Sequence, residues 1–220
     1  MKSSANIRFL ITAGPTREFF DPIRYISNRS SGKMGYAIAE AAAAVSGEVT
    51  LVSGPTALTP PRGVAFVSVM TAQEMAEAVW GRFDAVDVCI MAAAVCDFRP
   101  KKMASIKIKK ARLADGWQLD LEPTPDILAE LGRRKKSQVL IGFAAETDDL
   151  ESHAREKLTR KGLDLIVANE ASAFEADTNR VTFITTEGTS DQLPELPKGE
   201  VAARIIERAV RLFSGGRRVR

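Results

Sequence analysis

Alternation of short apolar runs with amphipathic segments constrains the fold of this chain more than any other feature. Residues 86–93 form a nearly continuous apolar run, as expected of a central strand buried on both faces of a sheet. The other expected strands are 7–12, 49–53, 64–69, 139–143, 163–168 and 181–185. Between them lie expected helices, from the glycines near residue 33 to Ala44, from Thr71 to about Phe83, over 149–161 and over 198–213. This order predicts an α/β fold with a doubly wound, Rossmann-like, mostly parallel sheet.

The alternation breaks between Cys96 and Thr124, where no helical pattern is present. Residues 105–110 and 117–121 are the expected strands of a small β flap, about residues 98–123, that projects from the main sheet. Regular alternation resumes at Thr124, which we predict to cap a helix with Pro125 in its first position. We expect a single domain over residues 1–213, followed by a frayed basic tail, 214–220.

Composition excludes several functional classes. The 220 residues carry a formal net charge of +3 and are 45% hydrophobic and 27% charged, which is ordinary for a soluble globular protein and gives no sign of nucleic-acid binding. There is no apolar run near ~20 residues and no signal-like segment at the N-terminus, so we expect a cytoplasmic protein without a membrane anchor. Two cysteines are too few for a disulfide scaffold. His153 is the only histidine; it falls on an expected surface helix, which weakens a His-ligated metal site or a catalytic triad.

The stretch from Arg24 to Gly35 has the composition of an anion-binding loop. Small polar residues and glycines at a helix N-terminus leave backbone N–H groups free to face a phosphate or carboxylate, and the helix dipole favours a negative charge there. The residues that would form this cradle are Asn28, Ser30, Ser31, Gly32 and Lys33. The spacing matches neither a P-loop nor a dinucleotide fingerprint, and no carboxylate follows the second strand to bind a ribose. The alternative is that Gly32 and Gly35 only allow close packing of the helix on the sheet.

Four segments should converge where ligands bind to a doubly wound sheet, at the carboxyl ends of the strands. These are Ala13–Gly35, Ala92–Asp97, Gly142–Glu146 and Asn169. From spacing alone, Asp97 is as consistent with a turn-forming residue as with a ribose or metal ligand.

Three lysines farther along the chain also have two interpretations each. Lys107, in Lys107-Ile-Lys-Lys110, belongs either to a basic arm that covers phosphates or to an edge strand protected by its lysines. Lys157 and Lys161 share one helix face, and their spacing alone favours a solvated helix end.

Taken together, the motifs resemble those of bacterial phosphopantothenoylcysteine synthetases, over about residues 7–213. The motifs that carry this resemblance are Ile11-Thr-Ala-Gly-Pro-Thr-Arg17, Asp21-Pro-Ile-Arg-Tyr-Ile-Ser-Asn28, Ser30-Ser-Gly-Lys-Met-Gly35, Val52-Ser-Gly-Pro55, Ala92-Ala-Ala-Val-Cys-Asp97, Lys107-Ile-Lys-Lys110, Pro125-Asp-Ile127, Gly142-Phe-Ala-Ala-Glu146 and Asp164-Leu-Ile-Val-Ala-Asn169. Several ordered motifs in one chain are far more specific than a single glycine-rich loop.

The resemblance implies a ligase of coenzyme A biosynthesis. In that family 4'-phosphopantothenate attacks the α-phosphate of CTP, and the resulting acyl cytidylate is captured by L-cysteine, with release of pyrophosphate and CMP. It also implies Mg²⁺ and a homodimer whose active sites are shared between subunits, while no decarboxylase activity is expected because the chain starts at the ligase strand.

The resemblance assigns roles residue by residue. Asn28 would hold the acyl group and Lys107 would neutralise charge at the α-phosphate, which makes these two the catalytic candidates. The residues implied in nucleotide binding are Ser31, Gly32, Met91, Ala92, Ala93, Asp97, Lys107, Pro125, Asp126, Ile127, Phe143, Lys157 and Lys161. No protein metal ligand is assigned.

Three alternatives remain open from the sequence. The same ligation could be driven by ATP, as eukaryotic relatives are thought to do. A nicotinamide-dependent oxidoreductase would use a similar sheet, although its fingerprint is missing. A nucleotide-binding scaffold would bind CTP without turnover.

Overall fold

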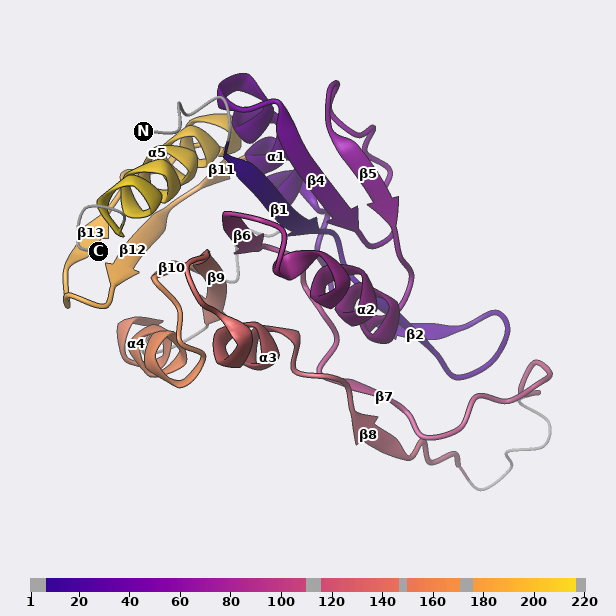
Figure 1. Ribbon diagram of the computed structural model, residues 1–220. Helices are drawn as coiled ribbons and strands as arrows, with labels where there is room; N and C mark the ends of the chain where they lie inside the picture. Colours follow the sequence, from indigo (N-terminus) through magenta and orange to yellow (C-terminus); the bar gives the residue numbers. More distant parts are fainter. Residues whose placement is uncertain (1–6, 110–115, 147–149, 171–175, 217–220) are drawn as a thin grey trace.

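An eight-stranded sheet forms the centre of the computed structural model, which describes residues 7–109, 116–146, 150–170 and 176–216 (Figure 1). The strand order is β13-β12-β10-β9-β6-β1-β4-β5. The strands from β10 to β5 run parallel to one another, whereas β12 and β13 are antiparallel to their neighbours. The bounds are β1 Arg8–Ala13, β4 Glu48–Ser53, β5 Ala65–Ser68, β6 Val88–Met91, β9 Val139–Glu146, β10 Leu165–Glu170, β12 Val181–Thr185 and β13 Ser190–Gln192. The predicted doubly wound, mostly parallel sheet is confirmed.

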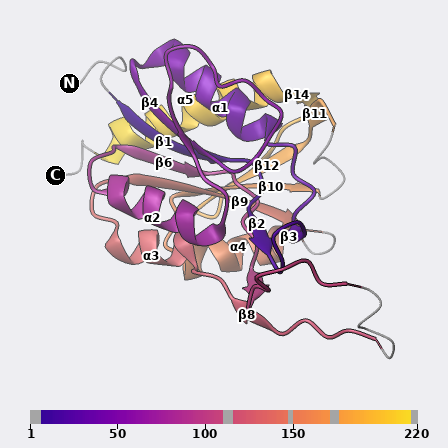
Figure 2. The same cartoon turned by 90° about the vertical axis from the view of Figure 1, so that its right-hand side faces the viewer.

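Helices cover both faces of the sheet. On one face lie α1 (Lys33–Val45) and α5 (Lys198–Gly216), and on the other lie α2 (Ala72–Phe83), α3 (Ile127–Arg134) and α4 (Leu150–Arg160) (Figure 2). Successive strand residues point to opposite faces, so the central strands contribute to both apolar cores. In β1, for example, Phe9 packs in the core under α1 and α5, and its neighbour Leu10 packs in the core under α2, α3 and α4.

The strand order reverses between β1 and β6. From β1 the chain adds β4 and β5 on one side, and it then crosses back to add β6, β9 and β10 on the other. In sheets of this kind the carboxyl ends of the two strands at the reversal border a crevice in which ligands bind. The segments that follow β1 and β6 are joined directly, because the Ala94 N–H donates to the Gly14 carbonyl at 3.0 Å and the Thr16 N–H to the Ala94 carbonyl at 3.3 Å.

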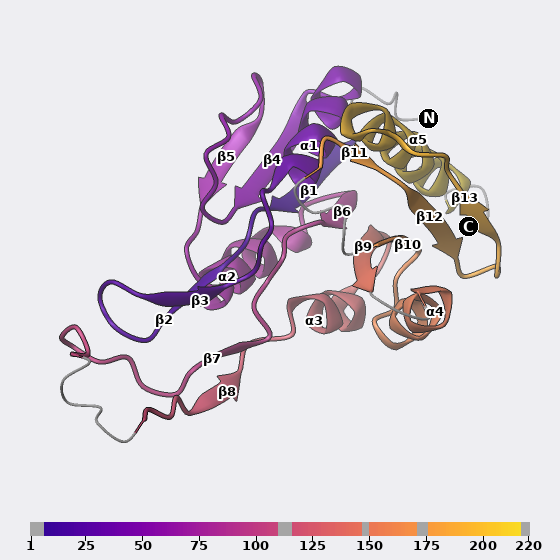
Figure 3. The same ribbon diagram turned by 180° about the vertical axis from the view of Figure 1, so that it is seen from behind.

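Two antiparallel strand pairs project from one end of the molecule (Figures 1 and 3). The β2–β3 hairpin pairs Arg17–Phe19 with Tyr25–Ser27, and the flap pairs β7 (Phe98–Pro100) with β8 (Leu121–Pro123). The flap lies along the hairpin, because the Ala104 N–H donates to the Phe20 carbonyl at 2.9 Å and the rings of Phe20 and Trp117 lie 5.2 Å apart.

A flap is present where we predicted one, but the predicted positions of its strands were wrong. The described part of the first predicted strand, residues 105–109, is not in a strand; Lys110 lies outside the described residues. Of the second, 117–121, only Leu121 belongs to a strand. The physical reason is that both backbone groups of Ile108 bond to side chains of the hairpin, Asp21 and Arg24, so they are not available for a ladder.

The predicted start of α3 also needs correction. Asp126 rather than Thr124 is the N-cap, and its Oδ1 accepts a hydrogen bond from the Ala129 N–H at 3.0 Å. Thr124 instead donates its hydroxyl to the Cys96 carbonyl, so Pro125 precedes the cap. At the ends of two other helices, Thr71 caps α2 by accepting from the Glu74 N–H, and Gly162 follows α4 with a positive φ of 61°.

Several ends of elements differ from the sequence-based expectation. The short pair β11 (Thr178–Asn179) and β14 (Leu196–Pro197) was not predicted, and α5 continues past Phe213 to Gly216. Asp149 and the last part of the basic tail, 217–220, lie outside the described residues. Among the helices that are described, none has the length and apolar character needed to cross a membrane.

Close packing of α1 on β1 depends on Gly35. A Cβ atom at this position would lie 2.5 Å from the Ala13 Cβ and 2.8 Å from the Thr12 carbonyl oxygen. Gly35→Ala is therefore expected to lower the free energy of unfolding by about 1–3 kcal/mol, as overpacking does. Urea unfolding of both variants measures the change. Gly81→Ala is the matched control, because this helical glycine has open space around it and the change should stabilise by about 0.5–1 kcal/mol. Equal stability of the Gly35 variant and the parent would contradict the packing argument.

Candidate active site

Two adjoining cavities lie at the carboxyl ends of β1, β6, β9 and β10, as predicted for a doubly wound sheet. The larger cavity has a volume of about 620 Å³ and the smaller one about 230 Å³. They share a wall formed by Ala93, Val95, Asp97, Phe143 and Lys157. A single extended ligand can therefore occupy both.

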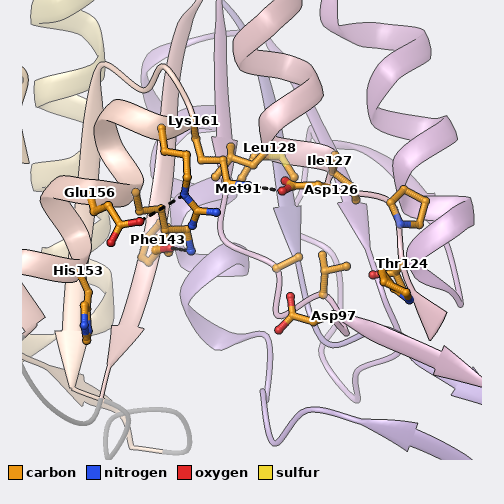
Figure 4. Close-up of a pocket in the computed structure, with 16 residues that line it drawn as sticks. Met91, Asp97, Thr124, Asp126, Ile127, Leu128, Phe143, His153, Glu156 and Lys161 are labelled. Atoms are coloured by element: carbon orange, nitrogen blue, oxygen red, sulfur yellow. Dashed lines mark hydrogen bonds and ion pairs between the residues drawn. The ribbon is translucent and has the colours of Figure 1, made fainter. Parts of the chain in front are cut away.

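The larger cavity gathers most of the predicted nucleotide-binding residues, on elements far apart in the sequence. These are Met91, Ala93, Asp97, Pro125, Asp126, Ile127, Phe143, Lys157 and Lys161. In Figure 4 Asp97, Asp126 and Phe143 surround the cavity, and His153 stands at its margin. The side chain of His153 is exposed, as expected for a surface helix, but it also borders the cavity.

Lys157, on α4, and Lys161, just after its last residue, both line the larger cavity. Lys161 is only 8% exposed and forms an ion pair with Asp126, the N-cap of α3. Lys157 donates to the Phe143 carbonyl at 2.8 Å. Spacing alone favoured a solvated side chain at the helix end, and for Lys161 this prediction is wrong. Packing of α3 against the end of α4 buries the side chain.

The pair also fixes the charge state of Asp126. Desolvation, the largest effect on this carboxyl, raises its pKa, but hydrogen bonds from Lys161 and from the Ala129 N–H outweigh it. The net result is a pKa of Asp126 below the ordinary value. Asp126 is therefore ionised at neutral pH.

Charges in the larger cavity are balanced. Its cationic side chains are Lys157, Arg160 and Lys161, and its carboxylates are Asp97, Asp126 and Glu156. Arg160 and Glu156 face each other at 3.8 Å, and Lys161 pairs with Asp126. A balanced, polar cavity with one aromatic ring suits a neutral group that carries hydroxyls and amides.

The smaller cavity is cationic and lies at the N-terminus of α1. It is lined by Ser30, Ser31, Gly32, Lys33, Met34, Gly35, Ala92, Ala93, Ala94, Val95, Asp97, Phe143, Lys157, Asn169, Asn179 and Lys198. Three lysines and one carboxylate, Asp97, thus line this cavity, and a second carboxylate, Asp177, pairs with Lys33 at 2.6 Å, which leaves an excess of positive charge. The N-cap of α1, Gly32, has no side chain that could accept hydrogen bonds from the first backbone N–H groups of the helix. This arrangement suits phosphate groups.

The glycines at this helix N-terminus have a structural role. Gly32 has a positive φ of 79°, and a Cβ there would lie 2.7 Å from the Thr56 Cγ2. The packing role is confirmed for Gly35, as described above. Phosphate binding by Ser31 and Gly32 stays a prediction.

The two catalytic candidates are placed differently. Asn28 is exposed and lines neither cavity, but its amide nitrogen donates to the carbonyls of Ala94 and Val95, which line the smaller cavity, at 3.0 and 3.1 Å. Lys107 lies on the flap, exposed, and lines neither cavity. The structure thus brings Asn28 to the site within one chain and leaves the placement of Lys107 over phosphates a prediction.

Sequence reasoning missed Lys198 and Asn179. Lys198 is only 7% exposed, and burial, followed by the nearby charge of Lys33, lowers its pKa, although Asp177 opposes this effect. Asn179 is 4% exposed, and its Oδ1 has no hydrogen-bond partner among the residues that the structure describes. A usable signal was present for Lys198, because a positive charge in the first position of α5 opposes the helix dipole. No local signal distinguishes Asn179, which reaches the cavity only through the β11–β14 pairing.

A model of the family described as "DNA/pantothenate metabolism flavoprotein C-terminal domain" matches residues 4–212. The chain belongs to this family. The resemblance identified from the motifs is thereby confirmed.

Family relatives match nearly the whole chain. The coenzyme A biosynthesis bifunctional protein CoaBC of Bacillus subtilis (strain 168) is 50% identical over 203 residues, which are 90% of this chain and 50% of that protein. The chain therefore spans about half the length of this relative. The crystal structure of the C-terminal domain of a CoaBC protein is 48% identical, with a TM-score of 0.80 over 92% of this chain and 93% of that one. A Cab2 mutant in complex with phosphopantothenate-cysteine has a TM-score of 0.77 at 18% identity, over 97% of this chain and 89% of that one, and shares the fold.

Proposed function

We propose that this protein ligates 4'-phosphopantothenate to L-cysteine in coenzyme A biosynthesis, with CTP as the activating nucleotide. Membership of the family and the names of its coenzyme A relatives support the reaction class. The observation that carries the proposal is the division of charge between the adjoining cavities. The balanced larger cavity suits the nucleoside, and the cationic smaller cavity at the α1 N-terminus suits the phosphates.

The reaction proceeds in two steps. A carboxylate oxygen of 4'-phosphopantothenate attacks the α-phosphorus of CTP, the bond between the α-phosphorus and the bridging oxygen breaks, and pyrophosphate leaves. The amine nitrogen of cysteine then attacks the acyl carbon of the cytidylate. The acyl C–O bond breaks, CMP leaves, and the nitrogen loses a proton to solvent as the amide forms. Activation turns a poor leaving group into a good one, so positioning and charge stabilisation dominate the catalysis.

Different residues of this chain act in each of these steps. Asn28 holds the acyl group next to the Ala94 and Val95 carbonyls to which it is already bonded. Ser31 and Gly32 bind phosphates at the α1 N-terminus, and Lys107 neutralises charge that develops at the α-phosphate. Met91, Ala92, Ala93, Phe143 and the Pro125–Ile127 segment enclose the base and ribose, with Lys157 and Lys161 on the same side.

Mg²⁺ fits this proposal as a companion of the nucleotide. The ion needs few protein ligands when phosphate oxygens and waters complete its shell. Asp97, on the wall shared by both cavities, would hold the ion. When bound, Mg²⁺ would neutralise charge on the phosphate oxygens. Among the described residues no cluster of three or more His, Cys, Asp or Glu side chains is placed to hold a metal by itself.

We also propose that the protein works as a homodimer. Most of the exposed large apolar side chains lie on the β2–β3 hairpin and the flap, whereas Val45, Phe66 and Met70 are exposed elsewhere. Those on the hairpin and the flap are Ile23, Tyr25, Phe98, Met103, Ile106, Trp117 and Leu121. A two-fold contact along these projecting elements would bury them and carry Lys107 of one subunit toward the phosphates of the other. Light scattering of the purified protein measures the subunit number, and a monomer would contradict this proposal.

Pyrophosphate release tests the function. Purified protein is mixed with Mg²⁺ and 4'-phosphopantothenate, and CTP is compared with ATP, each with and without cysteine. Release with CTP, with CMP and the cysteine amide appearing only when cysteine is added, is the expected result. Release with ATP but not with CTP would support a ligase that uses ATP as its nucleotide. Tight CTP binding without release would favour a binding scaffold, and binding of NAD(H) without release would favour an oxidoreductase.

Replacing Lys198 tests the division between the cavities. Lys198→Gln is expected to weaken binding of CTP roughly tenfold or more, because a charge-assisted contact to phosphate is lost. Binding of cytidine, which lacks phosphates, should stay unchanged. Isothermal titration with both ligands measures the difference. Equal losses for CTP and cytidine would place Lys198 outside the phosphate site.

A further inference from the structure

Asp21 is a buried carboxylate that the proposed reaction does not use. It lies in the turn of the β2–β3 hairpin, and its side chain is inaccessible to solvent. Five N–H donors surround it. Its Oδ1 accepts from Ile23 N at 2.9 Å and Arg24 N at 2.8 Å, and its Oδ2 accepts from Arg24 Nε at 3.0 Å, Arg24 Nη2 at 2.6 Å and Ile108 N at 3.2 Å. These bonds, those from Arg24 above all, hold the pKa of Asp21 far below its usual range despite its burial.

The last of these donors belongs to the flap rather than to the hairpin. Ile108 is the residue after Lys107, and 87 positions separate it from Asp21. Its carbonyl also accepts from Arg24 Nη2 at 2.9 Å. The ion pair of Asp21 and Arg24 therefore holds Ile108 by both backbone groups, which fixes the path of the chain at Lys107.

The same hairpin leads directly to Asn28. Strand β3 ends at Ser27, whose hydroxyl donates to the Thr16 carbonyl at 2.7 Å, and Asn28 follows with its bonds to Ala94 and Val95. One small unit thus carries Asn28 at the base of the hairpin and holds the Lys107 segment at its turn. Figure 3 shows the hairpin and the flap at the same end of the molecule. A support of this kind holds the segment that carries a reacting side chain in one defined geometry.

We propose that Asp21 is a positioning residue that, together with Arg24, fixes the backbone beside Lys107 in register with the hairpin that carries Asn28. The inference rests on the proposed function for its catalytic consequence. It extends that function by assigning a role to a residue that touches no substrate. Asp21 acts through the Ile108 backbone, and its loss should be felt only in the step that needs Lys107.

Asparagine is the informative replacement at this position. An amide has the shape of the carboxylate but only one oxygen acceptor, and it places an NH₂ donor where two or three N–H groups now converge. Asp21→Asn therefore loses at least two of the five bonds in either orientation, without creating a cavity. Asp120→Asn is the matched control, because Asp120 is an exposed carboxylate on the same flap.

Limited proteolysis tests the structural half of the proposal without any activity. Trypsin cleaves after Lys107 and Lys109, on either side of Ile108. Cleavage there should be about tenfold faster or more in Asp21→Asn than in the parent or in Asp120→Asn, while cleavage elsewhere is unchanged. Equal rates at these bonds would overturn the inference, whatever the protein catalyses.

A double-mutant cycle tests the catalytic half. Asp21→Asn is expected to slow pyrophosphate release in the absence of cysteine by about 10- to 100-fold, the effect of losing charge-assisted bonds. In a Lys107→Gln background the same change should add little, because the residue that it positions is already absent. If Asp21→Asn slows release in the Lys107→Gln background by the same factor as in the parent, Asp21 acts by another route and the proposal is overturned. An unchanged rate of release from Asp21→Asn alone would also overturn it.

Arg24→Lys supplies a second variant if Asp21→Asn does not fold. Lysine keeps the positive charge but has a single nitrogen. It cannot reproduce both bonds of Arg24 to Asp21 together with the bond to the Ile108 carbonyl. Its exposed position makes misfolding far less of a concern. Faster cleavage at Lys107 and a non-additive loss with Lys107→Gln are again expected, and the absence of both would overturn the proposal. If the parent releases no pyrophosphate, the proposed function fails while the proteolysis still decides whether Asp21 holds the segment.

Discussion

Lys107→Gln is expected to slow formation of the acyl cytidylate by about 100- to 1000-fold, the range seen when one preorganised donor to a developing charge is removed. Glutamine keeps most of the length of the side chain and removes its charge. Affinity for CTP should change little, because Lys107 is exposed and lies away from both cavities in the single chain. Rapid-quench measurement of pyrophosphate release without cysteine isolates this step.

Lys109→Gln is the control for that variant. Lys109 is exposed on the same segment, two positions along, so its loss removes the same charge from the flap. The control should retain the rate of the parent. Unchanged release from Lys107→Gln would remove Lys107 from the mechanism, and equal slowing of both variants would point to a diffuse charge effect.

Asn28→Asp is expected to separate the two half-reactions. The replacement has nearly the same shape but lacks the NH₂ group that donates to the carbonyls of Ala94 and Val95, and it brings a negative charge close to those oxygens. The acyl group is then held poorly for attack by the amine. Pyrophosphate release should continue for one turnover, whereas capture by cysteine should fall by about 100-fold or more, so that acyl cytidylate accumulates.

Chromatography of quenched reactions, with labelled 4'-phosphopantothenate, measures that accumulation. The parent should show the intermediate only when cysteine is omitted. The variant should show it with cysteine present as well. If the variant forms no cytidylate at all, the assignment of Asn28 to the second step is wrong.

Local sequence patterns were sufficient to predict the sheet and the place of the site. The apolar run at 86–93 predicted a central strand, and β6 occupies Val88–Met91 beside β1 at the reversal of strand order. Because ligand sites of doubly wound sheets follow from topology, the convergence of the loop before α1 with Asp97, Phe143 and Asn169 could be predicted as well.

The features that could not be predicted all depend on contacts between distant segments. The pairing of Lys161 with Asp126 requires the end of α4 to pack beside the start of α3, and spacing within one helix contains no information on that. The flap is a similar case, because a carboxylate in the hairpin takes a backbone N–H that an isolated strand would use for pairing. Lys198 reaches the smaller cavity only because α5 packs beside α1.

The wall between the two cavities has a consequence for the order of events in the proposed reaction. Ala93, Val95, Asp97, Phe143 and Lys157 belong to both compartments, so the bond broken in the first step of the proposed reaction would lie at the boundary between them. Pyrophosphate can then depart from the smaller compartment without disturbing the contacts that retain the cytidine half in the larger one. The reactive intermediate stays anchored by its nucleoside while the space beside it empties for the incoming amine. A chain with a single merged pocket would have to loosen its hold on the intermediate in order to release the first product.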